Sequence, residues 1–272
     1  MTTTTLGRAA EKLKRGAFLA AKNTYWRLHG APRQRRHLFV AGVQRSGTNM
    51  LMDILEKSWL TDAYHERDPR AFDNYKMRER AVIDALVARS KAPVFVIKSL
   101  FELQELPQLM AHFSPAQTVW IVRSPYDTIN STLKSFRPHL VERVNRAVKP
   151  DCQEWLGAGM SAETRERVAP LVFPEMREED AAAIQWYIRN VLFFEMGFDE
   201  DPRVLACRYE TLVTHPEEEI RRICAFVDLP YVPRLSRGIF STSIGKRRRP
   251  QISPPVEALC EALHQRFKAL TP

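Results

Sequence analysis

The segment from Gly42 to Asn49 has the residue types and spacing of a phosphate-binding loop. It reads Gly-Val-Gln-Arg-Ser-Gly-Thr-Asn and lies between a short apolar run and a helical pattern. Backbone N–H groups and a helix N-terminus can hold a phosphate in such a place. The spacing from Gly42 to Gly47 is that of a Walker loop, but Thr48 and Asn49 replace its lysine and its Mg²⁺-binding hydroxyl. With its cation inside the loop, at Arg45, the segment suits a 5′-phosphate that carries a transferring group, with no metal ion.

A second pair of polar residues follows a later apolar run. Arg123 comes directly after residues 117–122, and Ser131 lies two turns into the helix that Ser124 and Pro125 are expected to open. An arginine can bind a second phosphate with paired N–H donors, and the serine can add a hydroxyl. The alternative for Arg123 is a surface ion pair.

Candidates for charge and proton chemistry lie after two further elements. Lys98 follows an apolar run at 93–97 and is the second choice, after Arg45, for stabilising a transferring group; its alternative is a capping or surface lysine. Glu66 and His65 follow the first helical pattern, and either can act as a general base or only orient an acceptor.

Alternating strands and helices are predicted to position these residues. Residues 37–42, 93–97, 117–122 and 203–207 each contain a run of consecutive apolar residues, which predicts strands of a parallel sheet covered on both faces. The expected fold is a single α/β domain with a P-loop-like phosphate-binding loop, and ligands are expected beyond the carboxyl ends of the strands. Expected helical features are a capping box at Ser99 and Glu102 opening a helix to Met110, helices at 180–196 and 254–270, a helix capped by Thr214, and an irregular helical insertion at 136–177.

Four segments together resemble the sulfotransferases that use 3′-phosphoadenosine 5′-phosphosulfate (PAPS), and most closely their bacterial and carbohydrate-type branches. The segments are residues 44–49, Arg123 with Ser131, residues 208–217 and residues 243–248, and they occur in the family's order. The resemblance departs from many cytosolic members, which have lysine at the place of Arg45 and an Arg-Lys-Gly motif in the last loop.

The resemblance implies site roles and a mechanism. It implies that the donor is held by Arg45, Ser46, Gly47, Thr48, Asn49, Arg123, Ser131, Tyr209, Lys246 and Arg248, with the adenine near Tyr209. It favours Glu66 as the base, with His65 as the alternative, in a metal-independent in-line transfer. The implied acceptor is a hydroxyl, less readily an amine, of a small molecule, a glycan or a lipid-linked compound. Trp186 and Asn190, one helical turn apart, either line the acceptor cleft or belong to the core.

Two other functions remain open from the sequence. One is a nucleotide-binding, membrane-peripheral protein without turnover, and the other is a small-molecule kinase, which Thr48 and Asn49 disfavour.

The positive charge is concentrated near the N-terminus. The chain of 272 residues has 41 basic and 32 acidic residues, a net charge of +9, and residues 1–37 hold nine of the basic residues and one acid. We therefore divide the chain into a basic amphipathic arm, residues 1–36, and a sulfotransferase-like domain, residues 37–272. The arm either lies on an anionic membrane surface or packs on the body with its lysines in water. No nucleic-acid-binding signature accompanies the charge.

The remaining composition favours the cytoplasm. The apolar runs are far shorter than a membrane span, and the N-terminus lacks the apolar region of a secretory signal. The four cysteines form no CxxC pair, so neither a zinc site nor a redox motif is expected. The expected location is the cytoplasm, with the arm possible as a peripheral contact to the inner face of a membrane.

Overall fold

A five-stranded parallel sheet forms the centre of the molecule. The computed structural model describes residues 5–30, 34–137, 139–152 and 154–271, with the side chains of residues 5–12 and 29 left out. The strand order is β2-β5-β1-β6-β7, and every pairing is parallel. The strands are β1 (Arg36–Gly42), β2 (Thr61–Tyr64), β5 (Val94–Ser99), β6 (Ala116–Val122) and β7 (Val204–Arg208). The α/β prediction and its four strands are confirmed, and β2 is an additional edge strand.

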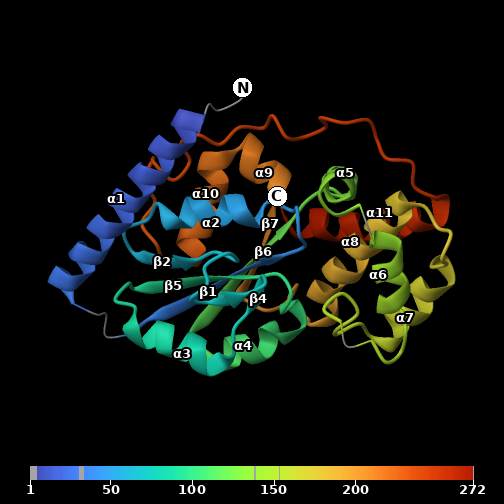
Figure 1. Cartoon of the computed structure of the whole chain (residues 1–272), viewed down its shortest axis with the longest axis horizontal. Coiled ribbons are helices and arrows are strands. Elements are labelled where there is room, and N and C mark those ends of the chain that lie inside the picture. Colours follow the sequence, from blue (N-terminus) through green and yellow to red (C-terminus); the bar gives the residue numbers. More distant parts are fainter. Residues whose placement is uncertain (1–4, 31–33, 138, 153, 272) are drawn as a thin grey trace.

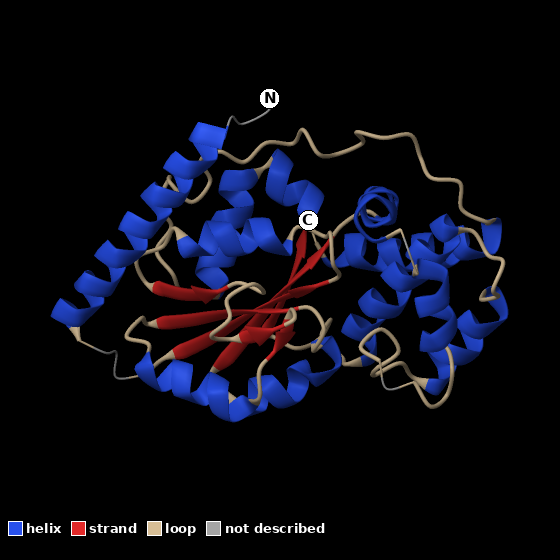
Figure 2. Cartoon of the chain, in the orientation of Figure 1, coloured by secondary structure: helices blue, strands red, loops and turns tan. Residues whose placement is uncertain are grey.

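Helices cover both faces of this sheet because its strands are apolar on both sides. Along β1, Phe39 packs into one buried cluster, whereas Leu38 and Val40 pack into the other. Figure 2 shows the two helical layers with the strands between them. On one face lie α2 (Thr48–Glu56), α9 (Tyr209–Thr214) and α10 (Pro216–Phe226); on the other lie α3 (Arg80–Arg89) and α4 (Leu106–His112).

A helical lobe stands beside the sheet (Figure 1). It contains α5 (Pro125–Phe136), α6 (Leu140–Ala147), α7 (Ala162–Val168), a 3₁₀ turn (Ala169–Leu171), α8 (Glu178–Glu195) and α11 (Pro254–Leu270). The short, irregularly spaced helices between α5 and α8 are the predicted helical insertion. Trp186 and Asn190 of α8 are fully buried, so the core interpretation of this pair is confirmed.

The predicted capping box at Ser99 and Glu102 is wrong. Ser99 is the last residue of β5, the chain then passes through a 3₁₀ turn (Leu103–Glu105), and α4 begins at Leu106. The Glu102 carboxylate instead accepts a hydrogen bond from the Met77 backbone N–H, at 2.8 Å. It thereby fastens a small antiparallel hairpin, β3 (Phe72–Asp73) and β4 (Lys76–Met77), which the sequence did not indicate.

The predicted Thr214 cap is wrong as well. Thr214 ends α9, and its hydroxyl donates to the Glu210 carbonyl oxygen at 2.8 Å. The helix α10 starts after His215 without a side-chain cap. The chain forms the short helix α9 directly after β7, and Thr214 belongs to that helix instead of capping the next one.

The N-terminal helix α1 (Thr5–His29) packs on the body. Arg15 forms an ion pair with Glu56 at 2.6 Å, and the Trp26 indole donates to the Trp59 carbonyl oxygen at 2.7 Å. Lys22 is only 1 % exposed and donates to the Glu56 carbonyl oxygen at 2.9 Å, so the expectation that the lysines of a packed helix face water is wrong at this position. Burial lowers the pKa of Lys22 to about 8.

The outer side of α1 keeps two large apolar side chains in water. Leu13 is 79 % exposed and Leu28 is 78 % exposed. In the described part of the chain, no helix combines the length and apolarity needed to cross a membrane.

Candidate active site

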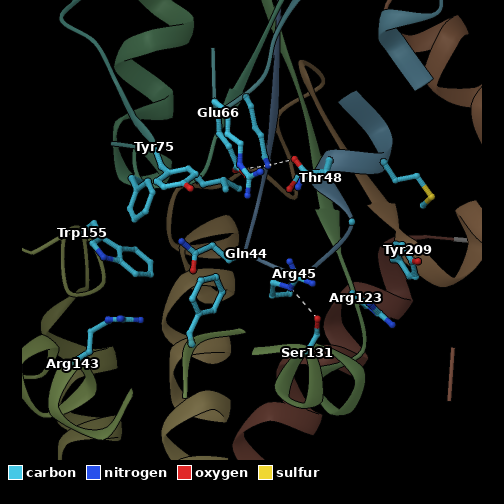
Figure 3. Close-up of a pocket in the computed structure, with 18 residues that line it drawn as sticks. Gln44, Arg45, Thr48, Glu66, Tyr75, Arg123, Ser131, Arg143, Trp155 and Tyr209 are labelled. Carbon is cyan, nitrogen blue, oxygen red and sulfur yellow. Dashed lines mark hydrogen bonds and ion pairs between the residues drawn. The ribbon is translucent and has the colours of Figure 1, made fainter. Parts of the chain in front are cut away.

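A cavity of about 530 Å³ opens at the carboxyl edge of the sheet (Figure 3). Nine of the predicted site residues line it: Arg45, Gly47, Thr48, Asn49, Glu66, Lys98, Arg123, Ser131 and Tyr209. They come from the loop after β1, the start of α2, the segment after β2, the end of β5, the β6–α5 connection, α5 and α9. Parallel strands bring these segments together because their carboxyl ends share one edge of the sheet.

The loop after β1 is shaped by two glycines. Gly42 has φ 144°, and a Cβ there would lie 2.3 Å from the Ile121 carbonyl oxygen. Gly47 has φ 107°, and a Cβ there would lie 2.3 Å from the Tyr209 ring. Only glycine allows the loop to approach its neighbours this closely. No side chain caps the N-terminus of α2, so its first N–H groups are available to an anion.

Ser46 supports the loop from inside. Its hydroxyl donates to the Val43 carbonyl oxygen at 2.6 Å, and its backbone N–H donates to the same oxygen at 3.2 Å. The residue is fully buried and does not line the cavity. Ser46 therefore closes the turn that carries Arg45.

Arg45 and Ser131 meet across the cavity. Arg45 donates from Nε to the Ser131 hydroxyl at 2.9 Å, and both side chains lie near the α2 N-terminus (Figure 3). The phosphate-binding-loop segment and the segment of Arg123 and Ser131 therefore form one polar surface.

Arg123 stands in a dense network at the same end. Its guanidinium donates to the Ser243 carbonyl oxygen at 2.8 Å, lies 3.6 Å from Asp127 and stacks 4.4 Å above the Tyr209 ring. The side chain is 11 % exposed, so this is not a surface ion pair. Its buried Nε has no hydrogen-bond partner among the described residues, and the Trp186 indole donates to its backbone carbonyl at 3.1 Å.

Lys98 and Glu66 form the second polar cluster. Lys98 donates to a Glu66 carboxylate oxygen at 2.5 Å and to the Asn49 side-chain oxygen at 2.6 Å. Lys98 is 1 % exposed, and burial lowers its pKa against the opposing effect of Glu66. It is neither a capping nor a surface lysine.

The structure does not bring His65 into this cavity. Its ring lies against α2, with Nε2 3.3 Å from Glu56 and Nδ1 3.8 Å from Asp53. Burial alone would raise the pKa of Glu56, but His65 and Arg15 beside it lower that pKa to about 2. His65 thus belongs to the contact between α1 and α2.

The last loop contacts two cavity-lining residues, Arg123 and Tyr209, through Ser243, which is neither of the two residues predicted for it. Ser243 contacts both Arg123 and Tyr209, the latter by a hydroxyl pair at 2.5 Å. Lys246 and Arg248 are exposed and do not line the cavity, although the Arg248 carbonyl oxygen accepts a bond from Asn130 at 3.2 Å.

Sequence reasoning missed the other end of the cavity. The residues there include Gln44, Arg67, Tyr75, Phe101, Phe136, Arg143 and Trp155. Tyr75 comes from the hairpin and Phe136, Arg143 and Trp155 come from the segment with weak periodicity, where no motif marks them. Gln44 lies in the predicted phosphate-binding loop, and Arg67 and Phe101 follow β2 and β5, but none of the three was assigned a role. Within the described residues, no group of acidic, histidine or cysteine side chains has the arrangement of a metal site.

Residues 35–243 match the family model of the sulfotransferase domain, which is more than half of the chain. The chain belongs to this family and is a sulfotransferase enzyme. PAPS is the family's sulfuryl donor. The binding protein without turnover and the small-molecule kinase are therefore not the functions of this chain.

Among the solved structures that resemble this chain, a structure with a TM-score above 0.5 shows the same fold. The sulfotransferase domain from the curacin biosynthetic pathway is 16 % identical, with a TM-score of 0.56 over 87 % of this chain and 99 % of that domain. The sulfotransferase STF9 from Mycobacterium avium is 15 % identical, with a TM-score of 0.49, over 97 % of this chain and 82 % of that one. The sulfotransferase domain of the Synechococcus PCC 7002 olefin synthase is 15 % identical, with a TM-score of 0.48, over 86 % and 98 %. No curated protein matches the sequence.

Proposed function

We propose that the chain transfers a sulfuryl group from PAPS to a hydroxyl of a small-molecule, glycan or lipid-linked acceptor, with Glu66 as the base. The observation that carries the proposal is the Lys98–Glu66 pair, which faces the same cavity as the phosphate-binding loop. An anion site and a carboxylate therefore share one space, as a transfer between two substrates requires.

The chain's own groups suit PAPS. The uncapped α2 N-terminus and Arg45 suit the 5′-phosphosulfate, and the buried Arg123 Nε without a partner suits a 3′-phosphate. Tyr209 supplies an aromatic surface for the adenine end. The exposed Lys246 and Arg248 follow Ser243 in the same loop, and we assign them to the outer side of the nucleotide.

When bound, PAPS supplies the sulfuryl group, whose sulfur exchanges its bond to the bridging phosphate oxygen for a bond to the acceptor oxygen. Glu66 takes the proton from the acceptor hydroxyl. A lysine ammonium has three N–H donors, and Lys98 uses one for Glu66 and one for Asn49, which leaves a donor for an oxygen of the reacting groups. Arg45 and Lys98 neutralise the charge that develops on the leaving and equatorial oxygens, so no metal ion is required.

Turnover of Glu66→Gln with labelled PAPS tests the base. The variant should bind PAP, the desulfated product, with wild-type affinity, since the carboxylate is not assigned to the nucleotide. Its turnover should fall by roughly 10² or more, the usual scale for the loss of a general base. His65→Ala is the matched control and should keep its turnover. Loss of turnover in His65→Ala with an active Glu66→Gln would overturn the assignment of the base.

We also propose that the arm of residues 1–36 contacts an anionic membrane surface through the outer side of α1. The exposed Leu13 and Leu28, together with the exposed Lys14 and Arg27, support this. The free cysteines, three of them buried, support a reducing compartment such as the cytoplasm.

A further inference from the structure

The end of the cavity away from Arg123 is aromatic and carries two arginines, the exposed Arg67 and the half-buried Arg143. Tyr75 and Trp155 border it, and the Arg143 guanidinium extends beneath Trp155 toward the interior (Figure 3). Phe101 packs edge-on against Trp155, with ring centroids 4.8 Å apart at 86°. These side chains form an apolar surface on which a flat or alicyclic part of a ligand can pack.

A buried arginine holds this wall in place. Arg189 of α8 is fully buried and donates to the carbonyl oxygens of Trp155 at 2.7 Å and Phe101 at 3.3 Å. It thereby ties the segment after β5 to the helical insertion. The aromatic end is fixed by the fold before any ligand arrives.

Arg143 has no counter-ion of its own. Within the described residues, its guanidinium makes no hydrogen bond or ion pair, and it is half-buried on α6. Glu154, whose charge acts on Arg143, forms its ion pair with Arg146 at 2.9 Å, and Glu142, next to Arg143 in the chain, pairs with Arg146 at 2.7 Å. Burial lowers the pKa of Arg143 and Arg146 lowers it further, against a smaller opposing effect of Glu154. An unpaired, partly desolvated cation that faces a cavity is a binding site for an anion.

The donor does not account for this cation. The donor end of the cavity holds Arg45, Lys98 and Arg123 beside the phosphate-binding loop, whereas Arg143 lies at the opposite end (Figure 3). Arg67, the other cation on that side, is exposed and lies 5.8 Å from the Tyr75 ring centre. Glu66 is the one carboxylate among the described lining residues.

We propose that the acceptor is a hydroxylated carboxylic acid with an aromatic or alicyclic body, whose carboxylate pairs with Arg143 while its hydroxyl reaches Glu66. The planar guanidinium matches a carboxylate with two parallel hydrogen bonds, and Trp155 covers the apolar body between the two polar ends. The inference rests on the proposed sulfuryl transfer and specifies its acceptor.

The test uses neutral partners of the same shape. A series of 4-hydroxyphenylalkanoic acids of increasing chain length is compared with the corresponding primary amides, in dissociation constant for the PAP-saturated protein and in kcat/KM with PAPS. The best acid should exceed its amide by about tenfold or more in both measurements, because a hydrogen bond to a charged group contributes more than a neutral one. In Arg143→Gln the constants for the acid should worsen while those for the amide stay unchanged, so that the acid-to-amide ratio falls to near one. Arg143→Lys should keep part of the preference for the acid.

Arg221→Gln is the matched control, because Arg221 is an exposed arginine already paired with Glu217 on the distant α10. Its ratio should equal that of the wild type. Equal constants for acid and amide in the wild type, or a preference that survives Arg143→Gln, would overturn the inference. The binding ratio decides this without turnover, whereas PAP binding without transfer to any acid or amide would count against the proposed function itself.

Discussion

Arg123 is fixed in place by contacts with three other residues. Its backbone is fixed by Trp186, its guanidinium by Ser243 and Tyr209, and its Nε still lacks a partner. A guanidinium held this firmly loses little side-chain entropy when a ligand binds. The contribution of Arg123 to the binding free energy therefore depends on whether the ligand carries a phosphate next to its Nε.

We expect Arg123→Ala to weaken PAP binding by about 10- to 100-fold, the range for a charge-assisted hydrogen bond, and to weaken adenosine 5′-phosphate binding by less than about threefold. Calorimetry with the two nucleotides measures the ratio, and Arg203→Ala, an exposed arginine paired with Asp201, is the control. Equal weakening of both nucleotides would show that Arg123 does not recognise the 3′-phosphate.

Residues at the end of the cavity that we propose for the donor could be picked out from the sequence because local chemistry marks them. Gly42 to Asn49 is one contiguous loop, and Arg123 and Ser131 follow a strand at helical spacing. Lys98 was predicted from the end of a strand, but its bond to Glu66 joins residues 32 positions apart and exists only in the folded chain. Arg143 and Trp155 carry no local signal, since they acquire a common cavity only when α6 and the following loop pack beside the sheet.

At the scale of elements, the β3–β4 hairpin places a strained tyrosine at the cavity. Its two turn residues, Asn74 and Tyr75, have φ 46° and 68°. Positive φ at both central residues is the geometry of a tight hairpin turn, which favours glycine and tolerates asparagine. Such a backbone conformation costs a bulky residue about 1–3 kcal/mol of stability. The tyrosine at this strained position lines the cavity.

Tyr75→Gly relieves this strain, but glycine loses more backbone entropy on folding, so the net rise in the free energy of unfolding should be about 1 kcal/mol. The KM for the acceptor should rise several-fold because the ring is lost. Thermal unfolding and acceptor kinetics measure the two effects. Asn74→Gly changes the same turn but keeps the ring, so it should leave KM unchanged. A variant Tyr75→Gly with wild-type KM would show that the ring takes no part in acceptor binding.

The α1 helix allows a second prediction at this scale. Because Trp26 and Lys22 face inward, only the outer residues can meet a membrane. The double variant Leu13→Glu and Leu28→Glu should lose co-sedimentation with anionic vesicles at low salt while keeping the melting temperature of the wild type. Vesicle binding that persists in this variant, or is missing in the wild type, would refute the membrane contact.

Long elements were predictable and short ones were not. The strands β1, β5, β6 and β7 each contain a run of consecutive apolar residues, and α11 begins and ends where its proline and periodicity indicate. The edge strand β2 has four residues, and the hairpin strands have two each, too few for a period to show. The capping pattern at Ser99 and Glu102 failed because tertiary contacts engaged Glu102 elsewhere.

At the scale of the whole molecule, the parallel sheet brings segments that are far apart in the sequence together around one cavity with two ends. One end gathers the phosphate-binding loop with Arg45 and Arg123, the other gathers aromatic rings with Arg143, and the Lys98–Glu66 pair shares the same cavity. The order of the strands, with β1 between β5 and β6, places the loop after β1 beside Lys98 on one side and Arg123 on the other. The arrangement predicts two substrates bound at once, with chemistry between them.

Transfer of label from [³⁵S]PAPS to hydroxylated acceptors, in the presence of EDTA, tests the central claim most directly. We predict acceptor-dependent formation of a labelled sulfate ester and of PAP in equal amounts, undiminished by EDTA, with no phosphoryl transfer from ATP and Mg²⁺ to the same acceptors. A requirement for Mg²⁺, or phosphorylated acceptors with ATP and none sulfated with PAPS, would contradict the account.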